Sequence, residues 1–180
     1  MVQDRTMADV DPGSDTRSGH LDRAGAHGVT LVIYSTITLL SVVVATTAKL
    51  YVDSYYELVI VAFGTCVGLV IAHAWAGMIS RVLVHKEHLG SGILFEEVRS
   101  ASWSFIPGVL LAVLLPVEAI FGVSFELAAT WAILALTVLL FVSGYFAALG
   151  IRHSKAAAWA WGGGSAAVGV LAVILKLAIS

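Results

Sequence analysis

Long apolar stretches alternate with short polar segments along most of this chain. After a polar start that ends near His27, five stretches carry few charges or none and are each about 20 residues long. A helix rises about 1.5 Å per residue, so roughly 20 apolar residues cross the hydrocarbon core of a bilayer, about 30 Å thick. The pattern therefore predicts an all-α, polytopic membrane protein, a bundle of five transmembrane helices at about residues 29–48, 58–79, 103–121, 127–151 and 156–179.

The second apolar stretch, Leu58 to Arg81, carries the most informative pattern, and we expect it to form the central helix of the bundle. Small residues recur at every fourth position, which places them on one face of a helix. They are Gly64, Gly68, Ala72 and Ala76. Small residues allow neighbouring helices in a membrane to approach closely. We expect this stripe to pack within the chain, and homodimerisation is the alternative.

The last span carries a similar stripe of small residues. Ala158, Gly162 and Ala166 follow at intervals of four residues, beside the triplet Gly162–Gly164. We expect Gly162 and Ala166 to let another helix approach closely.

The second span also holds His73, the only histidine inside an apolar stretch. Cys66, His73 and Ser80 lie seven residues apart and share one helix face, so they could line a partial polar path toward the inner surface. Ionisable side chains within a span usually face the bundle interior or a water-filled cavity. The imidazole could relay protons, or bind a soft metal with Cys66. The interpretation that we favour for His73 is a neutral histidine that bonds a hydroxyl of the first span or a carbonyl.

The first span has a polar face of its own, formed by Tyr34, Thr38 and Ser41. This face should point into the bundle. Its hydroxyls could line a hydrophilic pathway, or they could bond neighbouring helices and the carbonyls four residues earlier. The second interpretation is the one we favour, because such hydroxyls are common in membrane helix interfaces.

The segment between the second and third spans, residues 81–102, is amphipathic and should form short interfacial helices broken at Gly90–Gly92. His85 and His88 are three residues apart and could bind a metal ion with Glu96 or Glu97. A solvated cytoplasmic face is the interpretation that we favour. We therefore expect no cofactor and no established metal site.

Prolines and acids mark the third span and the turn after it. Pro107 lies in the first turn, where proline is tolerated, and Pro116 should kink the helix or end it early. Glu118 and Glu126 bracket the turn around Gly122. They could attract a cation at an outer vestibule, or both could simply lie in water.

The composition supports lipid as the solvent of most of the chain. Of its 180 residues, 59% are hydrophobic and 12% charged, and the mean hydropathy is +0.93. Soluble domains have roughly 45–50% apolar and 25% charged residues. The formal net charge of −2 gives no basic field for nucleic acid. Residues 1–27 should form a disordered cytoplasmic tail that is retained, followed by a transmembrane domain over residues 28–180.

The positive charges predict the orientation. Eight of the ten Lys and Arg residues fall in the N-terminal segment and in the connections after the second and fourth spans. They are Arg5, Arg17, Arg23, Arg81, Lys86, Arg99, Arg152 and Lys155. Lys49 and Lys176 lie on the opposite side. Positive charges concentrate on the cytoplasmic side, so we predict a cytoplasmic N-terminus and a C-terminus outside.

Three stretches, VIYSTITLLSVVVA, LVIAHAWAGMISR and GVLAVILKLAIS, resemble a family of small uncharacterised bacterial integral membrane proteins. The resemblance implies a multi-pass protein of the bacterial inner membrane. In layout alone, the chain is also similar to vacuolar-iron-transporter-like proteins, which imply five spans and an acidic inner loop. Those transporters carry acidic and methionine ligands in the first two spans. Here the first span has neither, and Met78 lies near the end of the second.

Catalytic motifs are absent from the sequence, so we do not expect an enzyme. The polar residues in the first two spans favour a small cation or proton transporter or a channel-like protein. The alternative is a non-catalytic membrane scaffold or an accessory subunit of a larger complex. The expected partners are the lipid bilayer and a second copy of the chain or another membrane protein.

Overall fold

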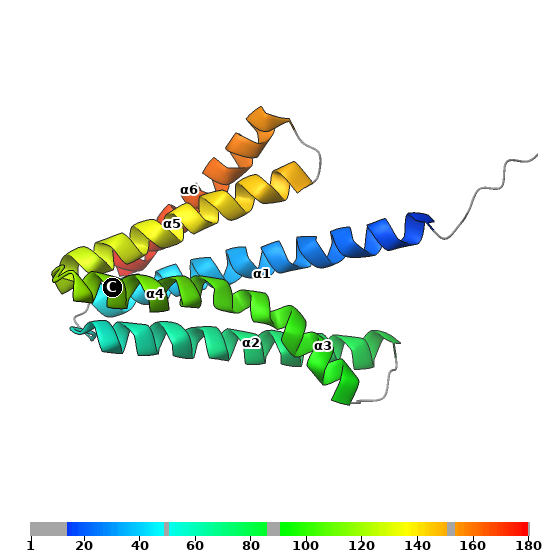
Figure 1. The fold of residues 1–180 in the computed structure, drawn as a ribbon, viewed down its shortest axis with the longest axis horizontal. Helices are drawn as coiled ribbons and strands as arrows, with labels where there is room; N and C mark the ends of the chain where they lie inside the picture. The colour runs from blue at the N-terminus through cyan, green and yellow to red at the C-terminus, as the bar shows by residue number, and fades with distance from the viewer. Residues whose placement is uncertain (1–13, 49–50, 86–90, 151–153, 180) are drawn as a thin grey trace, which may run out of the picture.

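The computed structural model describes residues 14–48, 51–85, 91–150 and 154–179, and these residues are helical apart from short turns. In chain order the helices are α1 (Ser14–Ala48), α2 (Tyr55–His85), α3 (Ser91–Ala101), the 3₁₀ turn η1 (Ser102–Phe105), α4 (Ile106–Ile120), α5 (Phe125–Gly150) and α6 (Lys155–Ile179). Figure 1 shows the long helices running back and forth along one axis. The all-α prediction is confirmed.

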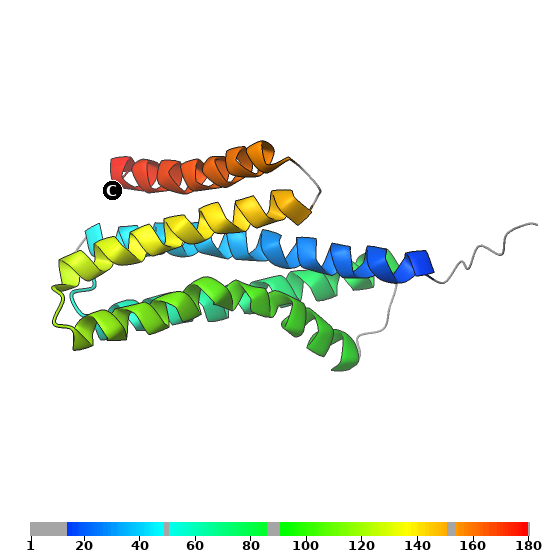
Figure 2. The same ribbon diagram turned by 45° about the horizontal axis from the view of Figure 1, so that its top comes forward.

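Five helical segments in the described part are long and apolar enough to cross a membrane, as predicted. They are His27–Ala48, Tyr55–Leu83, Leu94–Ile120, Phe125–Gly150 and Lys155–Ala178. The third begins earlier than the predicted residue 103, because α3, η1 and α4 follow one another without a break. Since the number of spans is odd, α1 begins at one end of the bundle and α6 ends at the other (Figure 2).

Within the third span, η1 and α4 alone are long enough to cross a bilayer. The 15 residues of α4 rise about 22 Å, and the four residues of η1 add about 8 Å, which together match a hydrocarbon core of about 30 Å. Pro107 lies in the first turn of α4, as predicted. The helix continues past Pro116 to Ile120, so it does not end early. Pro116 lies inside α4 and removes one of its backbone hydrogen bonds.

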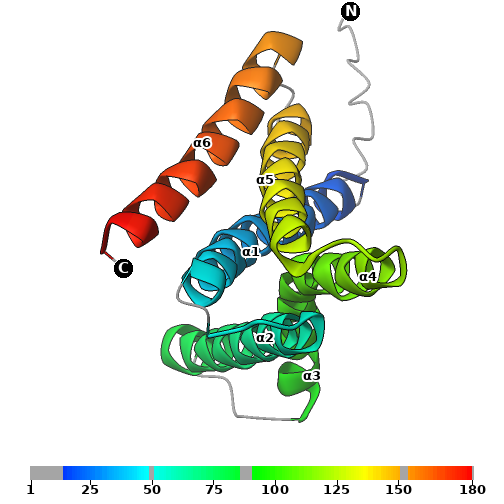
Figure 3. The same cartoon turned by 90° about the vertical axis from the view of Figure 1, so that its left-hand side faces the viewer.

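The centre of the bundle is α1, so the prediction that residues 58–81 form the central helix is wrong. In the described structure α1 contacts every other helical element. Half of the residues in its most apolar stretch are buried, against 28% in that of α2. Figure 3 looks along the bundle and shows α1 between α2 and α5. The core lies where α1, α2, α4 and α5 meet, and its buried members include Leu39, Leu40, Val43, Leu58, Leu111, Leu115, Leu136 and Leu140.

The start of α1 differs from the prediction of a disordered tail over residues 1–27. The helix already begins at Ser14 and runs into the first apolar span without interruption. Extending a formed helix costs far less than nucleating one, so a long apolar helix can carry a polar N-terminal extension. Residues 1–13 lie outside the described part of the chain.

The connection between α2 and α3 matches its prediction in outline. A short amphipathic helix, α3, packs on α2. Its residues from Leu94 onward also belong to the third candidate span, so its place at the membrane interface stays a prediction. The break was placed at Gly90–Gly92, but α3 begins at Ser91 and contains Gly92. Residues 86–90 lie outside the described part.

Candidate functional site

A cavity of about 280 Å³ lies at the end of the bundle where α1 enters it. It is formed by α1, α2 and α3, and the polar residues that line it are His27, His73, Ser80, Glu97 and Ser100. We call it the inner cavity, because the distribution of Lys and Arg predicts that this end faces the cytoplasm. Two of the three residues that were predicted to form a polar path, His73 and Ser80, therefore line the same space.

His73 is partly buried and presents one ring nitrogen to its own helix. Its Nδ1 atom lies 2.8 Å from the carbonyl oxygen of Leu69, one turn earlier. A carbonyl can only accept a hydrogen bond, so Nδ1 carries the proton and Nε2 is the acceptor of the neutral ring. The ring also meets Tyr34 of α1 edge to face, with centroids 5.2 Å apart. The bond to the Leu69 carbonyl matches the packing interpretation of His73, and it leaves Nε2 as the ring nitrogen with an available lone pair.

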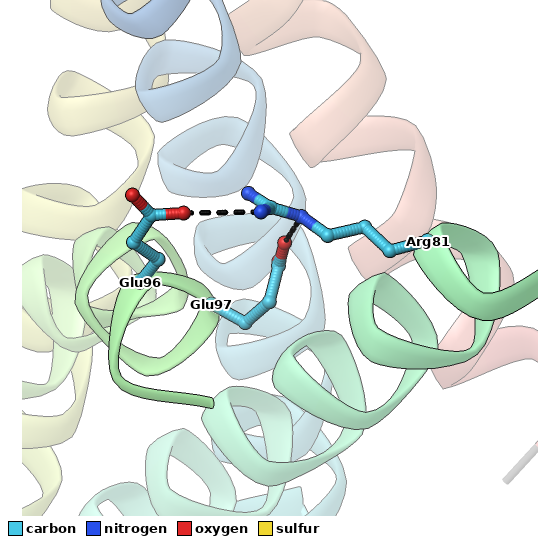
Figure 4. A network of polar contacts seen from close by, with 3 residues as sticks. All are labelled: Arg81, Glu96 and Glu97. Carbon is cyan, nitrogen blue, oxygen red and sulfur yellow. Dashed lines mark hydrogen bonds and ion pairs between the residues drawn. The ribbon is translucent and has the colours of Figure 1, made fainter. Parts of the chain in front are cut away.

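Glu97 is the acidic group of the inner cavity and is held by an ion pair. Arg81 Nε lies 2.7 Å from Glu97 Oε1, and Arg81 Nη1 lies 3.0 Å from Glu96 Oε2. Figure 4 shows both carboxylates directed at the guanidinium group. The Glu97 side chain is 15% exposed and that of Glu96 is 68% exposed, so the two pairs differ in burial. The more buried pair fixes α3 against the end of α2.

A glycine in α2 makes room for this pair. A Cβ atom added at Gly77 would collide with the carboxylate of Glu97. Gly77 was not singled out from the sequence. Its place in the sequence offered one clue, because Gly77 lies four residues before Arg81 and therefore shares its helix face. A side chain of α3 that reaches Arg81 passes over position 77.

Cys66, the third member of the predicted path, is separate from the inner cavity. It is fully buried in the core and packs against Gly108 of α4. The apolar residues around it close the bundle beyond His73. In this conformation the polar face of α2 therefore ends at His73.

The hydroxyl face of α1 is satisfied within its own helix. Thr38 donates to the carbonyl of Tyr34 at 3.0 Å, and Ser41 donates to that of Ile37 at 2.9 Å. Tyr34 is half exposed. Two hydroxyls that the sequence analysis did not single out, Ser35 and Thr36, are the fully buried ones, and both bond the carbonyl of Val32. The bonds to carbonyls four residues earlier match the packing interpretation. The expectation that this face points into the bundle is wrong for Tyr34, because the buried face of α1 runs through Ser35, Thr36, Leu39 and Leu40.

The small-residue stripe of α2 does not pack within the chain, contrary to expectation. Gly64, Gly68, Ala72 and Ala76 are all exposed, and a Cβ atom at either glycine would meet nothing within 4 Å. The physical reason is that the buried face of α2 runs through Leu58, Ala62, Cys66, Val70 and Ala74, on the other side of the helix.

The stripe of α6 does pack within the chain at Gly162. A Cβ atom there would lie 2.9 Å from the carbonyl oxygen of Phe141 in α5. Ala166 is only partly buried. The contact continues through Gly169, which lies against Leu140.

The weak metal candidates do not form a site in the described residues. His85 ends α2, its side chain lies outside the described part, and His88 lies outside it altogether. Glu96 and Glu97 are engaged by Arg81. Across the described residues no three His, Cys, Asp or Glu side chains come together as metal ligands would.

At the opposite end of the bundle, Glu118 and Glu126 lie in different surroundings. Glu126 lines a cavity of about 740 Å³ between α1, α5, α6 and the residues before α2, together with Asp53 and Ser124. Glu118 does not line it, and is instead buried at the end of α4. The predicted acidic pair is therefore one exposed acid and one buried acid.

The fold and the apolar surface define an integral, multi-pass membrane protein. No protein-family model, curated protein or solved structure matches this chain. Its family resemblance stays a prediction, and the functional argument rests on its own residues.

Proposed function

We propose that this membrane protein moves a proton or a small cation, and that His73 binds the ion at the inner end. The observation that carries the proposal is the inner cavity, where His73, Ser80 and Glu97 face one space within a bundle of apolar helices. Polar and ionisable groups are costly at such a position, and in membrane proteins they mark ion and proton pathways.

The chemistry of the cavity suits an ion that arrives from the cytoplasmic side. His73 Nε2 offers a lone pair, because Nδ1 is committed to Leu69. Arg81 neutralises Glu97 in part, so an ion that competes for the carboxylate would loosen the contact between α2 and α3. The closed core around Cys66 means that passage through the bundle requires movement of the helices.

The test is ion flux in liposomes that contain the purified protein. Wild-type protein should dissipate an imposed proton or cation gradient, and His73→Leu should abolish this flux. Trp75→Leu is the matched control, because Trp75 lies two residues away on the exposed surface of α2. Equal flux with His73→Leu would remove His73 from the mechanism. Absence of flux from wild-type protein under every gradient would remove transport.

The exposed stripe of α2 favours a second candidate, a scaffold or accessory subunit that associates through its membrane helices. Gly64 and Gly68 offer a surface on which a helix of a second copy or of another membrane protein can pack closely. Cross-linking in native membranes should then give a defined product that Gly68→Leu removes. Gly163→Leu, at an exposed glycine of α6, is the control. Recovery of the protein as a monomer throughout would refute this candidate.

A further inference from the structure

Glu118 carries the one buried carboxyl group in the part of the chain that the structure describes. The residue is 9% exposed, and its Oε2 atom is enclosed with no hydrogen-bond partner. The other polar side chains buried there belong to Ser35, Thr36 and Ser104. An acid enclosed at the end of a transmembrane helix without a partner requires a chemical explanation, because such groups are rare and costly.

The backbone holds this carboxyl group in place. Glu118 follows Leu111 and Leu115 on the buried face of α4. Its carbonyl accepts a hydrogen bond from the amide of Val123 at 3.1 Å, and the amide of Gly122 donates to Ala119. The hydroxyl of Tyr55, in α2, donates to the carbonyl of Val123. The turn is therefore tied both to α4 and to α2, and the side chain is directed inward by the register of the helix.

The charged groups at this end of the bundle do not neutralise Glu118. Glu57 of α2, Glu126 of α5 and Asp53 before α2 are exposed acids, and would repel a second negative charge. The hydroxyl of Tyr55 is bonded to Val123. Lys176 of α6 is exposed, and the described outer end of α1 carries no charge. Within the described structure Glu118 forms no ion pair.

Two ways remain to remove the charge of an enclosed carboxylate: a metal cation or a proton. A Ca²⁺ ion takes six to eight oxygen ligands, and Mg²⁺ six. No three potential ligand side chains of the acidic, histidine or cysteine type gather in the described residues. A proton needs only the carboxylate itself, so the geometry favours the proton.

We infer that Glu118 is a proton-binding carboxyl group at the outer end of the bundle, and that the ion handled by this protein is the proton. The inference rests on the proposed transport function and names its ion. His73 at the inner end and Glu118 at the outer end are each able to hold one proton. The buried apolar core, which includes Leu39, Leu111 and Leu115, closes the bundle in this conformation.

Carbodiimide labelling tests the protonation of Glu118 directly. The O–H group of a protonated carboxylic acid in an apolar site adds across one C=N bond of dicyclohexylcarbodiimide. The carboxyl oxygen bonds to the central carbon and the proton goes to a nitrogen, which gives an O-acylisourea that rearranges to a stable N-acylurea without a leaving group. Mass spectrometry of the intact, reconstituted protein should find the adduct at Glu118, with a yield that falls as pH rises. Glu126, eight residues away and exposed, is the internal control and should stay unlabelled.

The variant Glu118→Gln completes the experiment. It keeps the shape of the side chain and should abolish both the adduct and the proton flux into liposomes. An infrared band of a protonated carboxylic acid, present in wild type and lost in Glu118→Gln, provides a second measurement that does not depend on the reagent.

Three outcomes would overturn the inference, and each differs from a failure of His73. An unlabelled Glu118, with no acid band at any pH, shows that the group is not protonated there. A labelled Glu118 with wild-type flux in Glu118→Gln removes it from the pathway and leaves the role of His73 intact. A labelled Glu118 in a protein that conducts metal cations but not protons overturns the assignment of the ion, again without touching the proposed transport.

Discussion

Cys66 and Gly108 lie against each other where α2 packs on α4. A Cβ atom added at Gly108 would lie 2.5 Å from Cys66 Sγ and 3.3 Å from its Cβ. The thiol thus occupies the space that a larger residue at position 108 would need. The single cysteine of the chain is therefore a packing residue in this conformation. The contact predicts how the free energy of unfolding should change when position 108 is enlarged.

Gly108→Ala should destabilise the protein by about 1–3 kcal/mol, because the core is overpacked. Cys66→Ala should relieve most of that loss in the double variant, since the sulfur atom that causes the clash is gone. The free energy of unfolding in mixed detergent micelles measures both effects. Gly64→Ala is the control and should cost nothing, because its Cβ would meet nothing within 4 Å. Additive effects of the two core substitutions would contradict the contact.

The two ion pairs of Arg81 should contribute unequally to stability. Glu96 is largely exposed, so Glu96→Gln should change the free energy of unfolding by less than about 1 kcal/mol. Arg81→Gln breaks both pairs and leaves the enclosed carboxylate of Glu97 without its cation, so it should cost about 1–3 kcal/mol, most of it from the Glu97 pair. Thermal unfolding in detergent at low and high salt compares them, and only the Glu96 contribution should vanish with salt. Equal losses in both variants would show that Glu97 is accessible to water.

The turn between α4 and α5 should depend on Gly122. This residue has a positive φ of 69° and caps α4, with hydrogen bonds from Gly122 to Ala119 and from Val123 to Glu118. Gly122→Ala places a side chain in a left-handed conformation, which costs about 1–2 kcal/mol. Gly122→Asn should cost less, because asparagine tolerates this region. Gly164→Ala in α6 is the control in the same unfolding measurement, and a loss there as large as at Gly122 would contradict the explanation.

Lengths and hydropathy were sufficient to predict the five spans, because crossing a bilayer imposes a minimum apolar length that the sequence shows directly. The neighbours of each face were not predictable. The stripe Gly64–Ala76 and the stripe at Gly162 have the same spacing, yet only Gly162 packs within the chain. Spacing places residues on one side of a helix, whereas the arrangement of the other helices decides whether that side is covered. For the same reason α2, rather than α1, was expected at the centre.

The candidate site shows the same limit. The spacing of His73 and Ser80 predicted that they share a helix face. The approach of Glu97 was not predictable, because it depends on how α3 folds back on α2. The burial of Glu118 also required the structure. In sequence it stands beside a turn and resembles the exposed Glu126, and its register with Leu111 and Leu115 distinguishes the two.

The orientation predicted from the positive charges can be tested with two engineered cysteines. Ser124 and Ser154 are exposed and lie beyond opposite ends of α5. In a Cys66→Ala background, a membrane-impermeant maleimide added to intact cells should label Ser124→Cys and leave Ser154→Cys unlabelled, because the Lys- and Arg-rich end is predicted to face the cytoplasm. Both should react once the cells are opened, which controls for reactivity. Labelling of Ser154→Cys alone in intact cells would reverse the topology.

The contact between α5 and α6 should depend on Gly162 rather than on its neighbour Gly163. α6 is the least buried of the five spans, with 17% of its apolar segment buried, and it packs chiefly on α5. A leucine at position 162 would collide with the backbone and ring of Phe141 and separate the two helices, while a leucine at position 163 would point into open space. Gly162→Leu should therefore lower the free energy of unfolding by about 1–3 kcal/mol or more. Gly163→Leu should stay near wild type, and in lipid its extra apolar surface carries no penalty. A disulfide engineered between α5 and α6 should form in Gly163→Leu and fail to form in Gly162→Leu. Formation in both variants would show that contacts other than this close approach hold α6 in place.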